Sequence, residues 1–261
     1  MRRAQKPIVQ AGYVLGLPAL LVLGWWLAAR DATNFYVTTP DELWTTFVET
    51  WFGDRLGSDV LPSVARFATG TGLAIVLGIA LGVPIGLVRW LRRYTEPLFE
   101  FFRAIPPPVL VPVLMLVVGV NNSMKVLVIV SGAIWPVLLN TVEGVRAVDP
   151  VLRDTARTYR IDGFTRLRFV VLPAAAPQIF AGIRQALSVG LILMVISEMF
   201  ASSSGLGFTI VTFQRTFAVP EMWSGVLLLG LLGLMVSVVF QVTERRVLRW
   251  YHGQREVQHG R

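Results

Sequence analysis

Long apolar runs separated by short clusters of charge are the feature that most restricts how this chain can fold. Each run is about 20 residues long, which matches the helix needed to cross the hydrocarbon core of a bilayer. Only 15% of the 261 residues are charged, whereas about a quarter is usual in a soluble domain. The sequence therefore predicts an all-α, polytopic membrane protein with a single membrane domain over residues 1–261.

The apolar runs predict six transmembrane helices. The basic start of the chain, Met1–Lys6, precedes the first run and is interpreted as the flank of a retained helix rather than as a signal peptide. Several glycines in the second run predict close helix packing. The predicted spans are residues 11–29, 60–88, 105–120, 124–142, 174–200 and 223–242, with a tail over residues 243–261.

Basic connections alternate with connections that are poor in arginine and lysine. The start of the chain, the connection near Arg92, the long connection from Glu143 to Pro173 and the tail are all basic. Because cytoplasmic loops carry the excess of basic residues, both termini are predicted to be cytoplasmic. The net charge of +8 then reflects orientation in the membrane and not binding of nucleic acid.

An amphipathic helix is predicted between the first two spans, over Asp41–Phe52. Leu43, Phe47 and Trp51 recur every four residues, with acidic residues between them. This helix is expected to lie at the outer membrane surface. Tryptophan is common at membrane interfaces, and the residues expected to act as interfacial anchors are Trp25, Trp26, Trp51 and Trp223.

The long cytoplasmic connection has a helix–turn–helix pattern. Asp149 is a good N-cap and Pro150 suits the first helical position, so a helix is predicted from there to about Arg160. Asp162-Gly163 is a turn, because glycine tolerates a positive φ. A second short helix follows, and Pro173 is expected to open the fifth span.

This connection resembles the Glu-Ala-Ala loop of the permeases of ATP-binding-cassette importers. The family pattern is matched by Asp154-Thr155-Ala156, Gly163 and Leu172-Pro173 at the same spacing. Aspartate replaces the usual glutamate, and threonine replaces the first alanine. The acid and the small-residue face are kept.

Two more segments resemble the nitrate, sulfonate and taurine branch of that superfamily. Phe102–Pro107 is similar to the Arg-x-Ile-Pro opening of the third span, and Ser197–Gly207 to a Glu-Met-Phe segment that ends in Ser-Gly-Leu-Gly. Val117-Val118-Gly119 departs from the Trp-Phe-Gly common there. The resemblance covers about residues 60–245.

The resemblance implies a type I importer permease in a bacterial inner membrane. Its partners would be a cytoplasmic ATPase dimer that holds ATP and magnesium, an extracytoplasmic solute-binding protein, a second permease subunit in a homodimer, and membrane lipid. The solute would be a small anion or organic molecule such as a sulfonate, nitrate or taurine. The 149–172 element would couple to the ATPase, and the residues implied in coupling are Asp154, Thr155, Ala156, Arg157, Arg160, Gly163 and Pro173.

Charged and hydroxyl side chains in or near the fifth span are candidates for the pathway. Glu198 would line the pathway, tie down an outer gate loop or serve as a structural carboxylate. Arg184 lies too far along the same helix to reach Glu198, at about 21 Å. It would pair with a carboxylate on another span, snorkel or attract an anion. Ser202, Ser203 and Ser204 form either a solute-contacting loop or a flexible outer turn.

The residue types needed for catalysis are sparse. There is no cysteine, and both histidines, His252 and His259, lie in the tail. The sequence thus predicts neither a catalytic site nor a metal or cofactor site in this chain. A secondary transporter or channel that works without an ATPase is the alternative, and such proteins usually carry an intramembrane ionisable relay.

Overall fold

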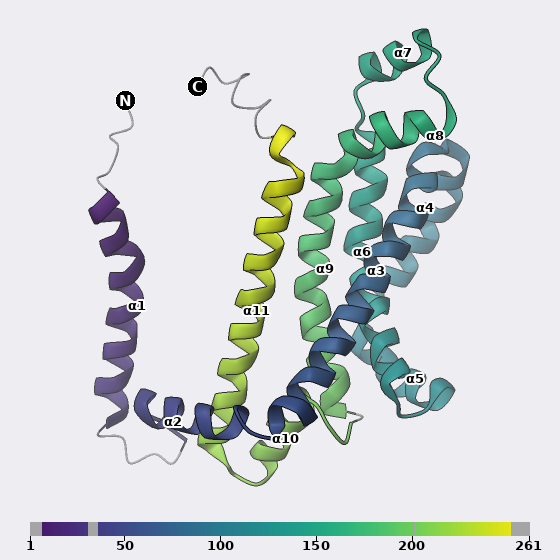
Figure 1. Ribbon diagram of the computed structural model, residues 1–261. Helices are drawn as coiled ribbons and strands as arrows, with labels where there is room; N and C mark the ends of the chain where they lie inside the picture. The colour runs from purple at the N-terminus through teal and green to yellow at the C-terminus, as the bar shows by residue number, and fades with distance from the viewer. Residues whose placement is uncertain (1–6, 31–35, 201, 252–261) are drawn as a thin grey trace.

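The computed structural model describes residues 7–30, 36–200 and 202–251, with side chains from residue 16 onward (Figure 1). This part of the chain contains helices and no strand, so the all-α prediction is confirmed. The helices are α1 (Pro7–Arg30), α2 (Pro40–Trp51), α3 (Leu61–Leu87), α4 (Arg89–Ala104), α5 (Leu110–Val118), α6 (Asn122–Arg146), α7 (Pro150–Thr158), α8 (Gly163–Arg166), α9 (Leu172–Phe200), α10 (Leu206–Arg215) and α11 (Val219–Val247).

The centre of the bundle is made by α3, α6 and α9, which pack closely because glycines meet larger residues. A methyl group on Gly78 would lie 2.7 Å from Cβ of Val137, and one on Gly82 would lie 2.7 Å from Cβ of Thr141. Gly70 and Gly86 of α3 make equally tight contacts with α6, as the sequence predicted, whereas Gly72 meets nothing within 4 Å. Small residues on one face of α3 therefore let the two helices touch almost backbone to backbone.

The third predicted span, residues 105–120, folds differently from a single crossing helix. Only α5 and the 3₁₀ turn Pro107–Val109 lie in it, and α5 has nine residues, or about 14 Å of helix. The preceding α4 is bent by 72° from the Pro107–Val118 helix. Because Ile105 and Pro106 are extended, the helix breaks there. The bent pair of α4 and α5 together, rather than residues 105–120 alone, is the candidate for one crossing.

Proline marks the start of two long helices in the same way. A π turn over Leu56–Val60 comes directly before Leu61-Pro62 of α3, and another over Leu167–Val171 comes directly before Leu172-Pro173 of α9. A π turn is wider than an α-helical turn, so it leaves room for the proline ring. The absence of an N–H on proline leaves no hydrogen bond unmade there. Pro173 is the second residue of α9, as expected, although the helical run that includes α9 begins earlier, at Gly163.

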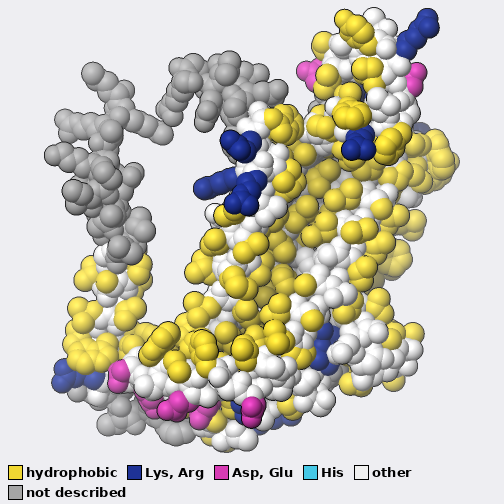
Figure 2. Space-filling view, viewed as in Figure 1, with side chains coloured by type: hydrophobic (Ala, Val, Ile, Leu, Met, Phe, Trp, Pro, Cys, Tyr) yellow, Lys and Arg dark blue, Asp and Glu magenta, His cyan; other side chains and the backbone are white. Residues whose placement is uncertain are grey.

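The outer edge of the bundle is formed by α1, α2 and α11. Leu43, Phe47 and Trp51 are buried on one face of α2, as the sequence pattern predicted. Trp51 is not an interfacial anchor, because its indole N–H donates to Ser224 Oγ of α11 at 2.9 Å and only 2% of its surface is exposed. Figure 2 shows the acidic side chains gathered along α2, and apolar side chains over the helices above it.

Four helical runs are long and apolar enough to cross a membrane, and the bent α4–α5 pair is a fifth candidate. The runs are Leu56–Leu87, Asn122–Arg146, Gly163–Phe200 and Val219–Val247, while the apolar part of α1 over Gly16–Arg30 is shorter. The chain is a multi-pass membrane protein, and the count of six spans remains a prediction. Tail residues beyond Tyr251 lie outside the described part of the chain.

Candidate functional site: a projecting helix and a buried polar cluster

The predicted coupling element lies at one end of the bundle, where α7 projects beyond the other helices (Figure 1), while Leu167 and Val171 after α8 pack against the bundle. Asp149 caps α7, because its carboxylate oxygen accepts the Val151 N–H at 2.7 Å. Ala156 is the buried residue of α7 and holds the helix to the rest of the chain. Around it, Val151 and Tyr159 are more than 70% exposed. This is a helix that is anchored on one side and offers the other side to a partner.

The charged residues of the element lie on its exposed side. Asp154 pairs with Arg157 at 3.7 Å, and both side chains are more than two thirds exposed. Such a pair contributes little to stability, because water screens it. Thr155 donates to the Val151 carbonyl at 2.8 Å. Of the predicted coupling residues, Ala156 therefore packs inward, and Asp154, Thr155 and Arg157 are exposed.

The turn after α7 has two residues in the left-handed region. Gly163 has a φ of 55°, as predicted, and Arg160 has a φ of 54°, which the sequence did not suggest. The Ile161 N–H donates to the Ala156 carbonyl at 2.8 Å and closes the end of α7. The exposed Arg160 thus holds a backbone position that glycine or asparagine usually fills.

One uninterrupted helical run joins this element to the opposite end of the molecule. It extends over Gly163–Phe200, 38 residues, or roughly 55 Å of helix. Pro173 lies in its early part and Glu198 near its end. The run passes through the middle of the bundle between α6 and α11 (Figure 1).

Glu198 is fully buried and lies in a cluster of polar groups from α3, α9 and the loop before α10. Its carboxylate oxygens lie 2.7 and 2.8 Å from Ser63 Oγ. One of them accepts from Arg66 Nη1 at 2.6 Å, and the other accepts the Gly207 N–H at 3.0 Å. The carboxylate is therefore neutralised and hydrogen-bonded, which makes its burial tolerable.

Arg66, from the second predicted span, is a central residue of the cluster that the sequence reasoning missed, as it missed Asp59, Ser63 and Lys125. Its side chain is 7% exposed. Besides Glu198, it donates from Nε to Asn122 Oδ1 at 2.9 Å and from Nη1 to the Ser204 carbonyl at 3.2 Å. An arginine within an otherwise apolar, glycine-rich run was the signal that could have identified it.

The loop before α10 is held to this cluster by both backbone and side-chain bonds. The Gly205 N–H donates to Asp59 Oδ1, and the Leu206 N–H donates to Ser63 Oγ, both at 2.9 Å. Lys125 of α6 donates to Ser202 Oγ at 2.7 Å. A methyl group on Gly205, whose φ is 117°, would lie 2.6 Å from Cδ of Glu198. The loop is thus clamped over a buried ion pair.

The three serines of the loop differ in their surroundings. Ser202 and Ser204 take part in the cluster, since Ser204 bonds to Arg66 and Ser202 to Lys125. Ser203 is exposed. The structure brings Glu198, Ser202 and Ser204 together, and it leaves Ser203 and Arg184 outside the group.

Arg184 forms an ion pair with Glu244 of α11, at the other side of the bundle. Its guanidinium also lies 5.8 Å from the centre of the Phe240 ring. Of the alternatives left open by the sequence, pairing with a carboxylate on another span is the one that the structure contains. The Arg184 side chain is still 59% exposed.

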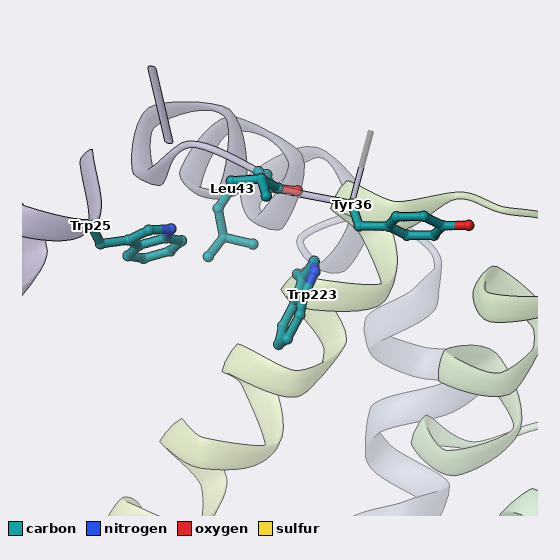
Figure 3. Close-up of a pocket in the computed structure, with 6 residues that line it drawn as sticks. Trp25, Tyr36, Leu43 and Trp223 are labelled. Carbon is teal, nitrogen blue, oxygen red and sulfur yellow. The ribbon is translucent and has the colours of Figure 1, made fainter. Parts of the chain in front are cut away.

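A separate aromatic cavity lies where α1, α2 and α11 meet. Figure 3 shows Leu43 lying between Trp25 and Trp223, while Tyr36 points away from them. The cavity has a volume of about 330 Å³ and also touches Val37 and Thr38. Its walls are almost wholly apolar, so nothing in it resembles a site for a charged solute. No group of three or more potential metal ligands is found in the part of the chain that the structure describes.

The fold and the two polar features define a polytopic, all-α membrane transport protein. Residues 74–250 match the family described as binding-protein-dependent transport system inner membrane component. The chain belongs to this family, whose members are the permeases of ATP-binding-cassette importers.

The relatives lie in the branch that the motifs predicted. The chain is 29% identical to an aliphatic sulfonates transport permease protein of Bacillus subtilis, over 92% of this chain and 88% of the relative. It is 34% identical to the bicarbonate transport system permease protein of Synechococcus elongatus, over 76% and 74%. A taurine transport system permease protein of Escherichia coli is 26% identical, over 92% and 90%.

A solved methionine transporter has the same fold. The inward-facing MetNI methionine transporter aligns with a TM-score of 0.59 at 18% identity, over 80% of this chain and 99% of that one. The permease assignment is therefore confirmed over the secondary-transporter alternative, and the fold is that of a type I importer permease.

Proposed function

We propose that this chain forms half of the translocation pathway of an ATP-driven importer and takes up a small anionic or zwitterionic solute. The relatives named for sulfonates, bicarbonate and taurine support this solute class. The pathway would be completed by a second copy of the chain in a homodimer. A solute-binding protein would deliver the solute at the outer face, and lipid would surround the assembly.

The observation that carries the proposal is the rigid connection between α7 and the Glu198 cluster. Movement of α7 by a partner would be transmitted along the Gly163–Phe200 run, because the chain is helical from the turn after α7 to the Glu198 cluster. The far end of that run carries Glu198, which accepts from Arg66 and from the Gly207 N–H of α10, and Arg66 in turn donates to the Ser204 carbonyl of the loop before α10. Coupling would therefore be mechanical, from a projecting helix to a clamped loop.

The partner at α7 is a cytoplasmic ATPase dimer, which holds the ATP and magnesium. Val151 and Tyr159 provide an apolar and aromatic contact surface, while Asp154, Arg157 and Arg160 provide its charged rim. With α7 in the cytoplasm, the first residue of α1 and the last of α11 lie at the cytoplasmic end as well (Figure 1). This arrangement supports the prediction that both termini lie on the cytoplasmic side of a bacterial inner membrane.

The cluster around Glu198 and Arg66 would act as the outer gate. In the closed state the loop of Ser202–Gly205 is fixed by Arg66 at Ser204, by Lys125 at Ser202 and by Asp59 at Gly205. Displacement of the end of α9 would pull Glu198 from Arg66 and release the loop.

The experiment is a co-purification in mild detergent from cells that express the chain with its ATPase subunit. Gly163→Val and Gly163→Asn are compared with wild type. Both add a side chain where nothing lies within 4 Å, but only asparagine tolerates a φ of 55°. We expect ATPase recovery to fall several-fold for Gly163→Val and to stay near wild type for Gly163→Asn.

The control is the yield of correctly folded permease, measured by its thermal unfolding in detergent. If wild-type permease is folded and never retains an ATPase in several mild detergents, the coupling proposal is wrong. Equal recovery by all three proteins would contradict a role for this turn.

A further inference from the structure

The charged residues of α4 all lie on one side of the helix. At about 100° per residue, they fall within an arc of roughly 100°. A second arc is apolar and also exposed, and a third packs against the bundle through Leu91 and Phe99. The charged arc consists of Arg89, Arg92, Arg93, Glu96, Glu100 and Arg103, and the exposed apolar arc consists of Trp90, Tyr94, Leu98 and Phe101.

Contacts with α6 place the C-terminal end of the charged arc beside the core of the bundle rather than above it. The Phe99 ring lies 5.9 Å from that of Trp135, which is near the middle of α6. Pro107, just beyond α4, packs against Gly132, which is further along α6 toward its Asn122 end. Glu100 and Arg103 lie between these two contacts along the chain, so they are near mid-depth.

The charged arc and the exposed apolar arc cannot both face the same environment. Glu100 and Arg103 form an ion pair, with Nε 2.9 Å from Oε2, and their side chains are 57% and 48% exposed. A charged group at mid-bilayer costs at least about 2.5 kcal/mol even on the mildest scale. The apolar arc, with Phe101 at 64% and Leu98 at 55% exposed, suits lipid well. Charges that are neither in lipid nor in the protein core face water or a second subunit, and a pathway between two subunits supplies that water.

We propose that the charged arc of α4 lines the water-filled part of the translocation pathway, and that its arginines select for an anionic solute. Arginines outnumber glutamates on the arc, which makes the lining cationic. The neighbouring apolar arc faces lipid. This inference rests on the proposed function, because it assigns a helix face to that pathway and a charge to its solute.

The chain has no cysteine, so single-cysteine variants need no altered background. Neighbouring residues on the two arcs form matched pairs that differ little in depth. Glu100→Cys is compared with Phe101→Cys, and Glu96→Cys with Leu98→Cys, in the full-length protein in membrane vesicles. The rate of modification by a charged, water-soluble methanethiosulfonate reagent is measured. Labelling after denaturation in detergent verifies that every thiol is present.

We expect the cysteines of the charged arc to react at least ten-fold faster than their partners on the apolar arc. Equal rates at both arcs would mean that α4 lies in bulk water, and uniformly slow rates would mean that both arcs are covered. Either result overturns the proposal.

The charge preference is tested at Ala104→Cys, an exposed position beside Arg103 where no charge is removed. The ratio of rates for an anionic and a cationic methanethiosulfonate is compared with the ratio for a free thiol. We expect this ratio to rise several-fold at Ala104→Cys. An unchanged or lower ratio overturns the selection for anions.

Failure here can be told apart from failure of the importer assignment. Labelling reports on water at α4 whether or not an ATPase binds. Recovery of the ATPase in the co-purification does not depend on α4 labelling. Fast labelling of the charged arc without recovery of an ATPase would support the water-lined face of α4 and contradict the coupling. Recovery of the ATPase without fast labelling would support the coupling and contradict the water-lined face.

Discussion

Arg66 of α3 and Glu198 of α9 form a buried ion pair, with Nη1 2.6 Å from Oε1. The two residues are far apart in the sequence, and their pairing joins two helices of the central bundle to the loop before α10. Removing one partner of such a pair leaves the other charge buried without a counter-ion.

The Arg66→Leu variant should therefore be strongly destabilised. Loss of the guanidinium leaves the Glu198 carboxylate buried with fewer donors, at a cost of about 3–5 kcal/mol. Thermal unfolding of the detergent-purified protein measures this effect. The matched variant is the double change Arg66→Leu with Glu198→Leu, which removes both charges and should recover part of the lost stability. A double variant no more stable than Arg66→Leu alone would show that the ion pair is not the source of the effect.

Gly205→Ala should loosen the loop over the cluster. Its φ of 117° is strained for alanine, and the new methyl group would lie 2.7 Å from Arg66 Nη1. We expect a lower unfolding temperature and reduced uptake by the assembled importer. Gly57→Ala is the control at the same end of the molecule, because nothing lies within 4 Å of its added methyl group. Equal effects of the two changes would contradict this account.

Gly78→Ala should disturb the contact between α3 and α6. The added methyl group would lie 2.7 Å from Cβ of Val137 and 3.1 Å from the backbone nitrogen of Leu138, so the helices would have to separate. The cost is about 1–3 kcal/mol, as for other overpacked sites. At Gly72, on the same helix, an added methyl group meets nothing within 4 Å, and alanine there should be neutral or slightly stabilising. Thermal unfolding of both variants decides between these outcomes.

Thr71→Val should be neutral or stabilising. Among the described residues, the Thr71 hydroxyl is the buried side-chain group that makes no hydrogen bond. Replacing it by a methyl group removes a desolvation cost of about 1–3 kcal/mol. Thr141→Val is the control, since the equally buried Thr141 hydroxyl donates to the Val137 carbonyl at 2.7 Å. If Thr71→Val proves the more damaging of the two, the hydroxyl has a role that its surroundings do not reveal.

Sequence patterns predicted the features that depend on neighbours along the chain. The apolar face of α2, the cap at Asp149 and the turn at Gly163 follow from local spacing and from the φ that glycine permits. The motifs around Asp154-Thr155-Ala156 and Ser197–Gly207 led to the correct family for the same reason. The coupling and gate roles of these residues remain predictions.

Features that depend on distant partners could not be predicted in this way. Arg66 pairs with a residue 132 positions away, and only the fold brings the two together. Trp51 was expected to be an interfacial anchor because it is a tryptophan, but it is buried, and its indole N–H donates to Ser224 of α11. The charges of α4 suggested a cytoplasmic loop, since a hydropathy window averages over all faces of a helix. The apolar arc of α4 is lost in that average.

The close approach of α3 and α6 limits how this molecule can change shape. Successive side chains of α6 pack directly against glycines of α3, where no side chain separates the two backbones. These glycines are Gly70, Gly78, Gly82 and Gly86. If α6 slid along α3 by a fraction of a turn, each of these side chains would clash with the residues beside its glycine. Intermediate positions of the two helices are therefore sterically excluded. The two helices are in effect one solid part, and any transport cycle must be a rocking of that part against its neighbours. A change of shape is then easiest where the helix already breaks, at Ile105 and Pro106 between α4 and α5.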